Sequence, residues 1–220
     1  MYKIFHKQIR NLATILIVLL FSASLWQLAA ANWIQGKAIV AQHLLNSSWN
    51  KTLVSSKPVD ADQPVIHKPW PWADTWPVAK LIVPQYDIEQ IILAGDSGSS
   101  LAFGPGYSLA SARPNTAGTT MISGHRDTHF SFLKMLKLND TLLIQTANKT
   151  TSYQIYDIQV VDSNIFTLPQ NTDEQTLVLV TCYPFDALTA GGSSRYLIYA
   201  SGITAEKNYS SPVSERKIAL

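Results

Sequence analysis

The chain has a single cysteine, Cys182, among its 220 residues, so no internal disulfide can form. Charge is also sparse: charged residues make up 15% of the chain and the net charge is +2. The sequence lacks a cluster of lysine and arginine, a glycine-rich phosphate loop and any internal repeat. These absences give no support for a nucleic-acid partner, and we predict none.

Histidine is scarce as well, and its spacing does not predict a metal site. Of the five histidines, His125 and His129 are four residues apart, which on a helix would place them on one face. No glutamate lies between them in the arrangement of a zinc peptidase. We therefore predict no metal ion.

Charge is missing altogether from residues 11–31, a run long and apolar enough to cross a bilayer as a helix. Lys3, Lys7 and Arg10 precede it, so the positive-inside rule predicts a cytoplasmic N-terminus over residues 1–10 and a signal anchor over residues 11–31. The small residues at 29–31 also fit a signal-peptidase site, so a cleaved signal peptide is the alternative. Under both interpretations the rest of the chain is exported across the inner membrane, which places the folded domain in the periplasm.

Two segments connect the apolar run to the folded domain. Residues 32–54 have apolar side chains at helical spacing, which favours a juxtamembrane helix, with a solvated stalk as the alternative. Residues 55–77 contain five prolines and are rich in tryptophan, so this linker is predicted to be extended. Its tryptophans are predicted to pack on the domain, although a membrane-interface belt would use the same residues.

From residue 78 onward the pattern changes to short β segments separated by turn signals, up to about residue 203, and residues 204–220 form a C-terminal tail. Ser131–Leu138 is predicted to be a short helix. An all-β fold with many short strands at this spacing implies a closed or nearly closed β-barrel. The predicted strands are 80–84, 88–93, 118–122, 141–145, 153–161, 176–181 and 195–200.

The most informative residues are one histidine, one cysteine and one arginine, in that order along the chain. Cys182 ends the strand-like run at 177–181, His125 lies in a Gly-His-Arg-Asp segment, and Arg195 begins the next strand. Only a thiolate attacks a carbonyl, and nearby cations favour the thiolate. A buried and inert cysteine is the alternative, because free cysteines often behave as small hydrophobic residues.

Each member of this trio has a chemical role that suits its residue type. Cys182 would be the nucleophile, and His125 the general acid/base that protonates a leaving amine. Arg195 would bind a substrate carbonyl and the oxyanion that develops there, facing Cys182 across the connecting loop. Backbone N–H groups near Cys182, or the Thr181 hydroxyl, would add donors to this oxyanion. Asp127 would orient His125 or Arg126.

Residues from about Trp70 to Ser201 resemble the sortases, cysteine transpeptidases that cleave a C-terminal sorting signal and transfer the acyl group to an amine. Sortases carry a Thr-Leu-x-Thr-Cys strand, and this chain has Val178-Leu179-Val180-Thr181-Cys182, with valine in place of the first threonine. The Cys-Tyr-Pro-Phe continuation, which adds Tyr183 as a supporting residue, and the Arg195 strand also match. The segments at 76–81, 97–106 and 125–130 resemble the Gram-negative marine type in particular.

This resemblance implies an eight-stranded β-barrel, no obligatory cofactor, and a protein substrate with a C-terminal signal similar to Leu-Pro-x-Thr-Gly. Some sortases use calcium, but we find no clustered acidic loop here and predict none. The amine acceptor is left open among a peptidoglycan cross-bridge, a lipid-linked precursor and another protein. Water as acceptor would make the enzyme a protease.

Two other classes of function stay open. One is a different exported cysteine acyl-transfer enzyme; however, L,D-transpeptidases have glycine before the cysteine, where this chain has Thr181, and in papain-like proteases the cysteine precedes the histidine. The other is a non-catalytic anchored β-domain that binds a partner. It predicts that Cys182 is buried and can be replaced by alanine without loss of function.

Overall fold

The computed structural model describes residues 2–55, 66–167, 173–187, 189 and 191–203. The chain divides into two compact units, residues 1–43 and residues 44–220. The predicted C-terminal tail at 204–220 lies outside the described residues.

The N-terminal unit is helical throughout its described residues. It belongs to α1, which extends from Tyr2 to Ser55 and so includes the segments predicted as anchor and juxtamembrane helix. The apolar side chains at 15–21 are all exposed in the monomer. Within the described residues, one helical stretch, Thr14–Ser55, is long and apolar enough to cross a membrane, a property that signal sequences share.

The last turns of α1 belong to the second unit and pack on its barrel. Leu45 and Trp49 are buried in one apolar cluster with Ile91 and Leu93, against which Phe103 also packs. Of the linker predicted at 55–77, residues 56–65 lie outside the described residues, and the part from residue 66 onward contacts the same unit. The Trp70 ring meets the Phe103 ring edge to face at 5.1 Å, and the Thr75 hydroxyl donates to the carbonyl of Ala94 at 2.7 Å.

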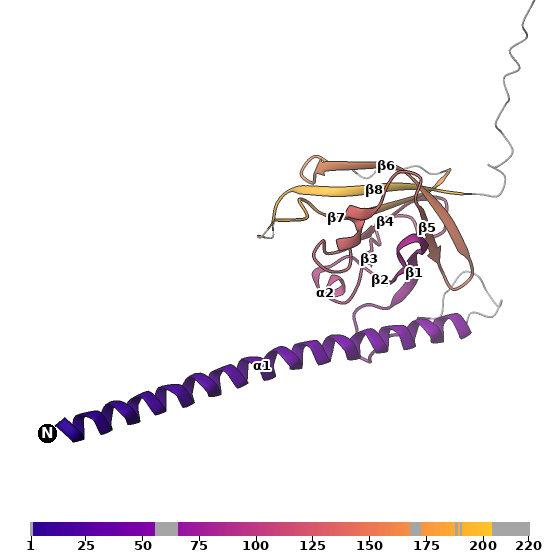
Figure 1. Ribbon diagram of the computed structural model, residues 1–220. Coiled ribbons are helices and arrows are strands. Elements are labelled where there is room, and N and C mark those ends of the chain that lie inside the picture. The colour runs from indigo at the N-terminus through magenta and orange to yellow at the C-terminus, as the bar shows by residue number, and fades with distance from the viewer. Residues whose placement is uncertain (1, 56–65, 168–172, 188, 190, 204–220) are drawn as a thin grey trace, which may run out of the picture. The chain divides into compact units, whose positions relative to one another are not determined.

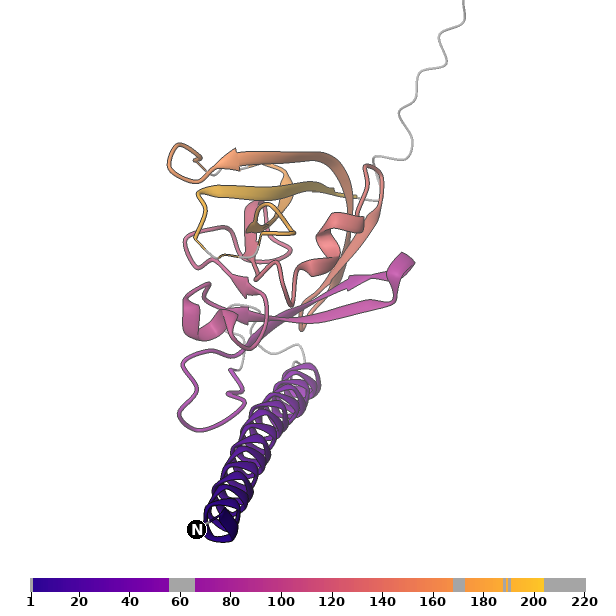
Figure 2. The same cartoon turned by 60° about the vertical axis from the view of Figure 1, so that its left-hand side comes forward.

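The second unit is a closed barrel of eight strands, as predicted, in the order β1-β2-β3-β4-β7-β8-β6-β5. Figures 1 and 2 show β6, β7 and β8 as long neighbouring strands. Three short helices, η1 (Pro84–Tyr86), α2 (Gly98–Leu101) and η2 (Ser131–Met135), lie in the connections. The strands are β1 (Pro77–Val83), β2 (Ile88–Ala94), β3 (Gly106–Tyr107), β4 (Gly118–Ser123), β5 (Thr141–Gln145), β6 (Thr150–Asp162), β7 (Gln175–Cys182) and β8 (Ser194–Gly202).

Alternating side chains divide the barrel wall into an inner and an outer face. In β1 every second residue is buried, which puts Ala79, Leu81 and Val83 into the main core. Strands β7 and β8 contribute four residues to the same core: Leu177, Leu179, Ile198 and Ala200. The outward residues of β7 and β8 form a second apolar cluster, in which Val178, Leu197 and Tyr199 are buried. Both faces of these two strands are therefore largely apolar.

The structure departs from the predicted elements at three places. The strand predicted at 80–84 begins earlier, at Pro77, and ends at Val83, because Pro84 begins the 3-10 helix η1, where its fixed φ suits the first helical position. Strand β3 was not predicted, because two residues are too few to show an alternating pattern. A glycine is required at position 106, because an added Cβ would lie 2.9 Å from the Cα of Asp96. The helix predicted over 131–138 is a 3-10 helix that ends at Met135. Beyond it the Asp140 carboxylate accepts a hydrogen bond from the Lys137 amide, which holds a turn in place of further helix.

Candidate active site

Cys182 and Arg195 are direct cross-strand partners at one end of the antiparallel β7–β8 pair. Directly opposed residues project from the same face of a sheet, with Cβ atoms about 5 Å apart. Both side chains are half-buried. The prediction that these two residues face each other is confirmed by this register.

His125 reaches the same end of the barrel from β4. Strands β4 and β7 are parallel, and Ser123 pairs with Val180. The Gly124 amide continues the contact by donating to the Val180 carbonyl at 3.1 Å. His125 lies two residues beyond Ser123, and Cys182 lies two residues beyond Val180. An extension of this register therefore puts His125 level with Cys182. The structure therefore brings all three predicted residues to the end of three adjacent strands, β4, β7 and β8.

The Arg195 side chain lies along the end of its own strand. Its Nη1 donates to the carbonyls of Gly192 at 2.6 Å and Ser194 at 3.0 Å. The Asp162 carboxylate lies close to this side chain. Hydrogen bonds from the Asn164 amide and the Ser193 hydroxyl lower the pKa of Asp162, and the Arg195 charge makes a smaller contribution in the same direction. The hydrogen bonds described for the guanidinium all use Nη1, so Nε and Nη2 carry donors beyond them.

The face that carries Cys182 continues along the sheet as the outer apolar cluster. Val180 lies two residues before Cys182 on the same face of β7. It packs against the cluster that contains the buried Val178 and Leu197, as Phe166 also does. A half-buried thiol and a guanidinium thus stand at the end of an apolar strip, an arrangement suited to a chain with an apolar part next to a reacting carbonyl.

Comparisons with known proteins identify the family. A family model for the sortase domain matches residues 81–203. The chain belongs to the sortase family. Sortase D of Bacillus subtilis strain 168 is 32% identical to it over 127 residues, which are 56% of this chain and 63% of that protein. The match thus spans less than two thirds of that relative.

Solved sortases share the fold. A Clostridium perfringens sortase D5 transpeptidase superposes with a TM-score of 0.53 at 27% identity, covering 59% of this chain and 80% of the other. Sortase A from Corynebacterium diphtheriae gives a TM-score of 0.54 at 26% identity, covering 60% and 63%. The predicted family is therefore confirmed, and the Gram-negative marine type stays a prediction.

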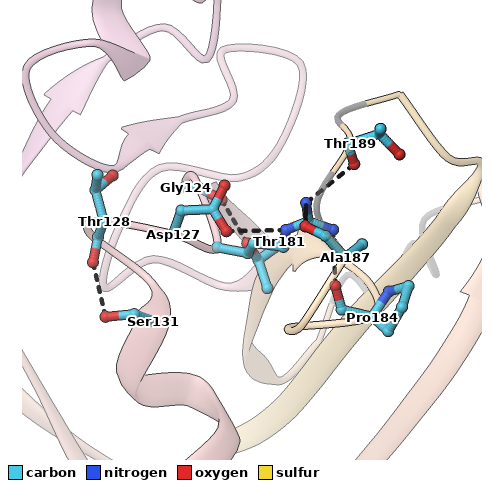
Figure 3. A network of polar contacts seen from close by, with 9 residues as sticks. Gly124, Asp127, Thr128, Ser131, Thr181, Pro184, Ala187 and Thr189 are labelled. Atoms are coloured by element: carbon cyan, nitrogen blue, oxygen red, sulfur yellow. Dashed lines mark hydrogen bonds and ion pairs between the residues drawn. The ribbon is translucent and has the colours of Figure 1, made fainter.

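Next to His125, this sortase has a buried arginine that the sequence analysis did not single out. Arg126 is 8% exposed. Its Nη1 donates to the carbonyl of Pro184 at 2.7 Å, and its Nη2 to those of Ala187 at 2.8 Å and Thr189 at 3.2 Å. Figure 3 shows these carbonyls and the Asp127 carboxylate converging on one point. The only sequence signal was the Gly-His-Arg-Asp segment itself.

The two predicted supporting residues on either side of the site serve this framework. Of the alternatives given for Asp127, the structure has the contact with Arg126, whose Nε lies 3.0 Å from the carboxylate. Thr181 is buried, and its hydroxyl donates to the Gly124 carbonyl at 2.7 Å. That hydroxyl joins β7 to the segment before His125. Its proton is therefore used by the Gly124 carbonyl, and Thr181 projects from the face of β7 opposite to Cys182.

Tyr183 belongs to an aromatic group beside Cys182. Its ring stacks on the Tyr196 ring at 6.1 Å, and Phe185 meets the Tyr196 ring edge to face at 5.1 Å. Burial raises the pKa of Tyr196, with a smaller contribution from Tyr183. The peptide bond between Tyr183 and Pro184 is cis. These rings give the chain a fixed path directly after the cysteine.

His129 lies close enough to His125 for their charges to interact. Burial lowers the pKa of His129, the His125 charge lowers it further, and a hydrogen bond with the backbone of Ala102 opposes the shift. The two histidines are not arranged as metal ligands: within the described ranges, no group of three or more His, Cys, Asp or Glu side chains could hold a metal ion.

Proposed function

We propose that this sortase-family protein is a cysteine transpeptidase, anchored in the inner membrane by α1, with its barrel in the periplasm. It would cut a C-terminal signal similar to Leu-Pro-x-Thr-Gly in a partner protein and pass the acyl group to an amine. The observation that carries the proposal is the opposed pair of Cys182 and Arg195, with His125 two residues beyond the end of the adjacent strand β4.

The first half of the reaction forms a thioester. The Cys182 thiolate attacks the carbonyl carbon of the scissile peptide bond, and the electron pair of that carbonyl moves onto its oxygen. Arg195 is placed to donate to this oxyanion through N–H groups other than those held by Gly192 and Ser194. When the tetrahedral intermediate collapses, the C–N bond breaks and the imidazolium of His125 protonates the leaving amine.

The second half reverses these steps with a new amine. Neutral His125 takes a proton from the incoming amine, whose nitrogen attacks the thioester carbonyl. The C–S bond then breaks, and Cys182 leaves as a thiolate. Attack by water in place of the amine would release a carboxylic acid, so the ratio of transfer to hydrolysis depends on how well water is kept from the thioester.

The apolar strip supports a substrate that approaches along β7 and β8. Val180 and Leu197 lie next to Cys182 and Arg195 on the same face. Leu197 is fully buried, whereas Val180 is only partly buried. An apolar residue of the signal, such as its leucine, would contact Val180 while the scissile carbonyl lies between the thiol and the guanidinium. The non-catalytic alternative predicts a buried thiol, whereas Cys182 is partly exposed.

The first test is the reactivity of Cys182 towards iodoacetamide across pH, measured on the full chain in detergent micelles. We expect labelling of the folded protein, and a pH profile that changes in His125→Ala and in Arg195→Ala, because nearby cations favour the thiolate. Incubation with an LPxTG-like peptide should then give a protein adduct by mass spectrometry, lost on hydroxylamine treatment and absent in Cys182→Ala. Protection of the thiol until unfolding would contradict the proposal.

A further inference from the structure

Arg126 is the most completely bonded charged side chain near the site. An arginine has five N–H donors, and four described hydrogen bonds use the Nε, Nη1 and Nη2 atoms of Arg126. Burying a guanidinium is unfavourable unless its donors are satisfied. Three of the four acceptors are backbone carbonyls, so the sequence of the loop that supplies them is free to vary while the contact is kept.

These bonds join two segments that are far apart in the chain. Arg126 follows His125 directly, and its acceptors at Pro184, Ala187 and Thr189 all belong to the β7–β8 loop, which starts directly after Cys182 and ends at the strand of Arg195 (Figure 3). A single side chain therefore holds the segment that carries His125 against the segment that joins the other two proposed catalytic residues.

The opposite end of this loop is held by other side chains. Arg195 donates to Gly192 and Ser194, and the Ser193 hydroxyl donates to Asp162 at 3.0 Å. Arg195 has to share its donors with a substrate oxyanion, whereas Arg126 is buried and contacts no atom that reacts. Arg126 is thus the attachment at the Cys182 end of the loop that can stay in place while Arg195 binds substrate.

We propose that Arg126 is a positioning residue: it clamps the β7–β8 loop to the His125 turn and so sets the position of His125 relative to Cys182 and Arg195. This inference rests on the proposed function of that trio. Lysine is expected to be a poor replacement, because an ammonium group cannot bridge three carbonyls in the plane of the guanidinium fork.

The experiment compares Arg126→Lys with wild type and with His125→Ala, all as full chains in detergent micelles. Arg113→Lys is the matched control, since Arg113 is an exposed arginine outside the clamp. Three quantities are measured: the thermal unfolding midpoint, kcat and KM for a fluorogenic LPxTG-like peptide, and the pH profile of Cys182 alkylation by iodoacetamide.

For Arg126→Lys we expect kcat to fall on the order of 10- to 100-fold with KM changed less than threefold, as for a misplaced catalytic group. The alkylation profile should shift towards that of His125→Ala while the variant is still folded at the assay temperature. A merely structural arginine would lower the unfolding midpoint and leave the alkylation profile and kcat of the folded fraction unchanged. That result would overturn the inference.

Asp127→Ala provides a second variant should Arg126→Lys fail to fold. Asp127 is exposed and supplies one of the four acceptors, so its loss should weaken the clamp without unfolding the barrel. We expect a twofold to fivefold fall in kcat and a shift of the alkylation profile in the same direction; unchanged values would overturn the inference. If His125→Ala itself leaves alkylation and turnover at wild-type values, the proposed function fails, independently of the clamp.

Discussion

At the scale of single residues, the proposed site contains two arginines that differ in burial and in hydrogen bonding. Arg126 is buried and bonded through all three of its side-chain nitrogen atoms, whereas Arg195 is half-buried and bonded through Nη1. The first arrangement suits a fixed support and the second suits a group that binds and releases substrate in each cycle.

Arg195→Lys should therefore leave the fold intact and lower kcat/KM by about 100-fold or more, because lysine keeps the charge but lacks the fork that can hold both loop carbonyls and an oxyanion. The measurement is turnover of an LPxTG-like peptide, with circular dichroism as the check on folding. Turnover near the wild-type value would remove Arg195 from the mechanism.

The proposed catalytic trio could be predicted from the sequence, but the clamp could not. Cys182, His125 and Arg195 have residue types whose chemistry is specific, and each follows or begins a recognisable strand. Arg126 is bound mainly by carbonyls of Pro184, Ala187 and Thr189. Every residue has such a carbonyl, so no sequence pattern marks the acceptors. Their convergence depends on the path of a loop, which local patterns do not determine.

At the scale of elements, the strands of five residues or more could be predicted and the two-residue β3 could not. Strands β7 and β8 bury enough apolar side chains for their pattern to be recognised, and β6 is long enough, at 13 residues, to be recognised although it buries few. Strand β3 has two residues, pairs parallel to β2 and antiparallel to β4, and depends on Gly106 for a close approach. The end of η2 is similarly set by one side-chain contact, from Asp140 to the Lys137 amide.

The end of α1 contributes to the stability of the second unit through Trp49, which is 1% exposed. Trp49→Ala should lower the free energy of unfolding by about 3 kcal/mol or more, since it removes a large side chain from a packed cluster. Urea unfolding of the full chain in micelles, followed by circular dichroism, measures this change.

Val54→Ala is the matched control, because Val54 belongs to the same helix and is 78% exposed; its effect should lie within about 0.5 kcal/mol. Equal effects in the two variants would mean that the Trp49 contacts do not stabilise the second unit.

At the scale of the whole molecule, His129 should make stability depend on pH. Because burial and the His125 charge lower its pKa, the unfolded chain takes up this proton at a higher pH than the folded chain does. The contribution to unfolding free energy is constant above the unfolded pKa of about 6.5 and falls as the pH drops below it.

The unfolding midpoint of wild type should therefore decrease more between pH 7.5 and pH 5.5 than that of His129→Gln, as measured by thermal unfolding at the two pH values. His43→Gln, which changes an exposed histidine on α1, should behave as wild type does. The same pH dependence in wild type and His129→Gln would contradict the expected linkage.

The parallel pairing of β4 with β7 also affects how fast the site can assemble. Thr181 and Gly124, which join these strands, are 57 positions apart in the chain, and loops of that length must close before such contacts stabilise anything. A barrel with high contact order folds slowly compared with a helical bundle. In the proposed export, His125 crosses the membrane before Cys182 does, so the thiol can meet its proposed partners only after most of the barrel has crossed.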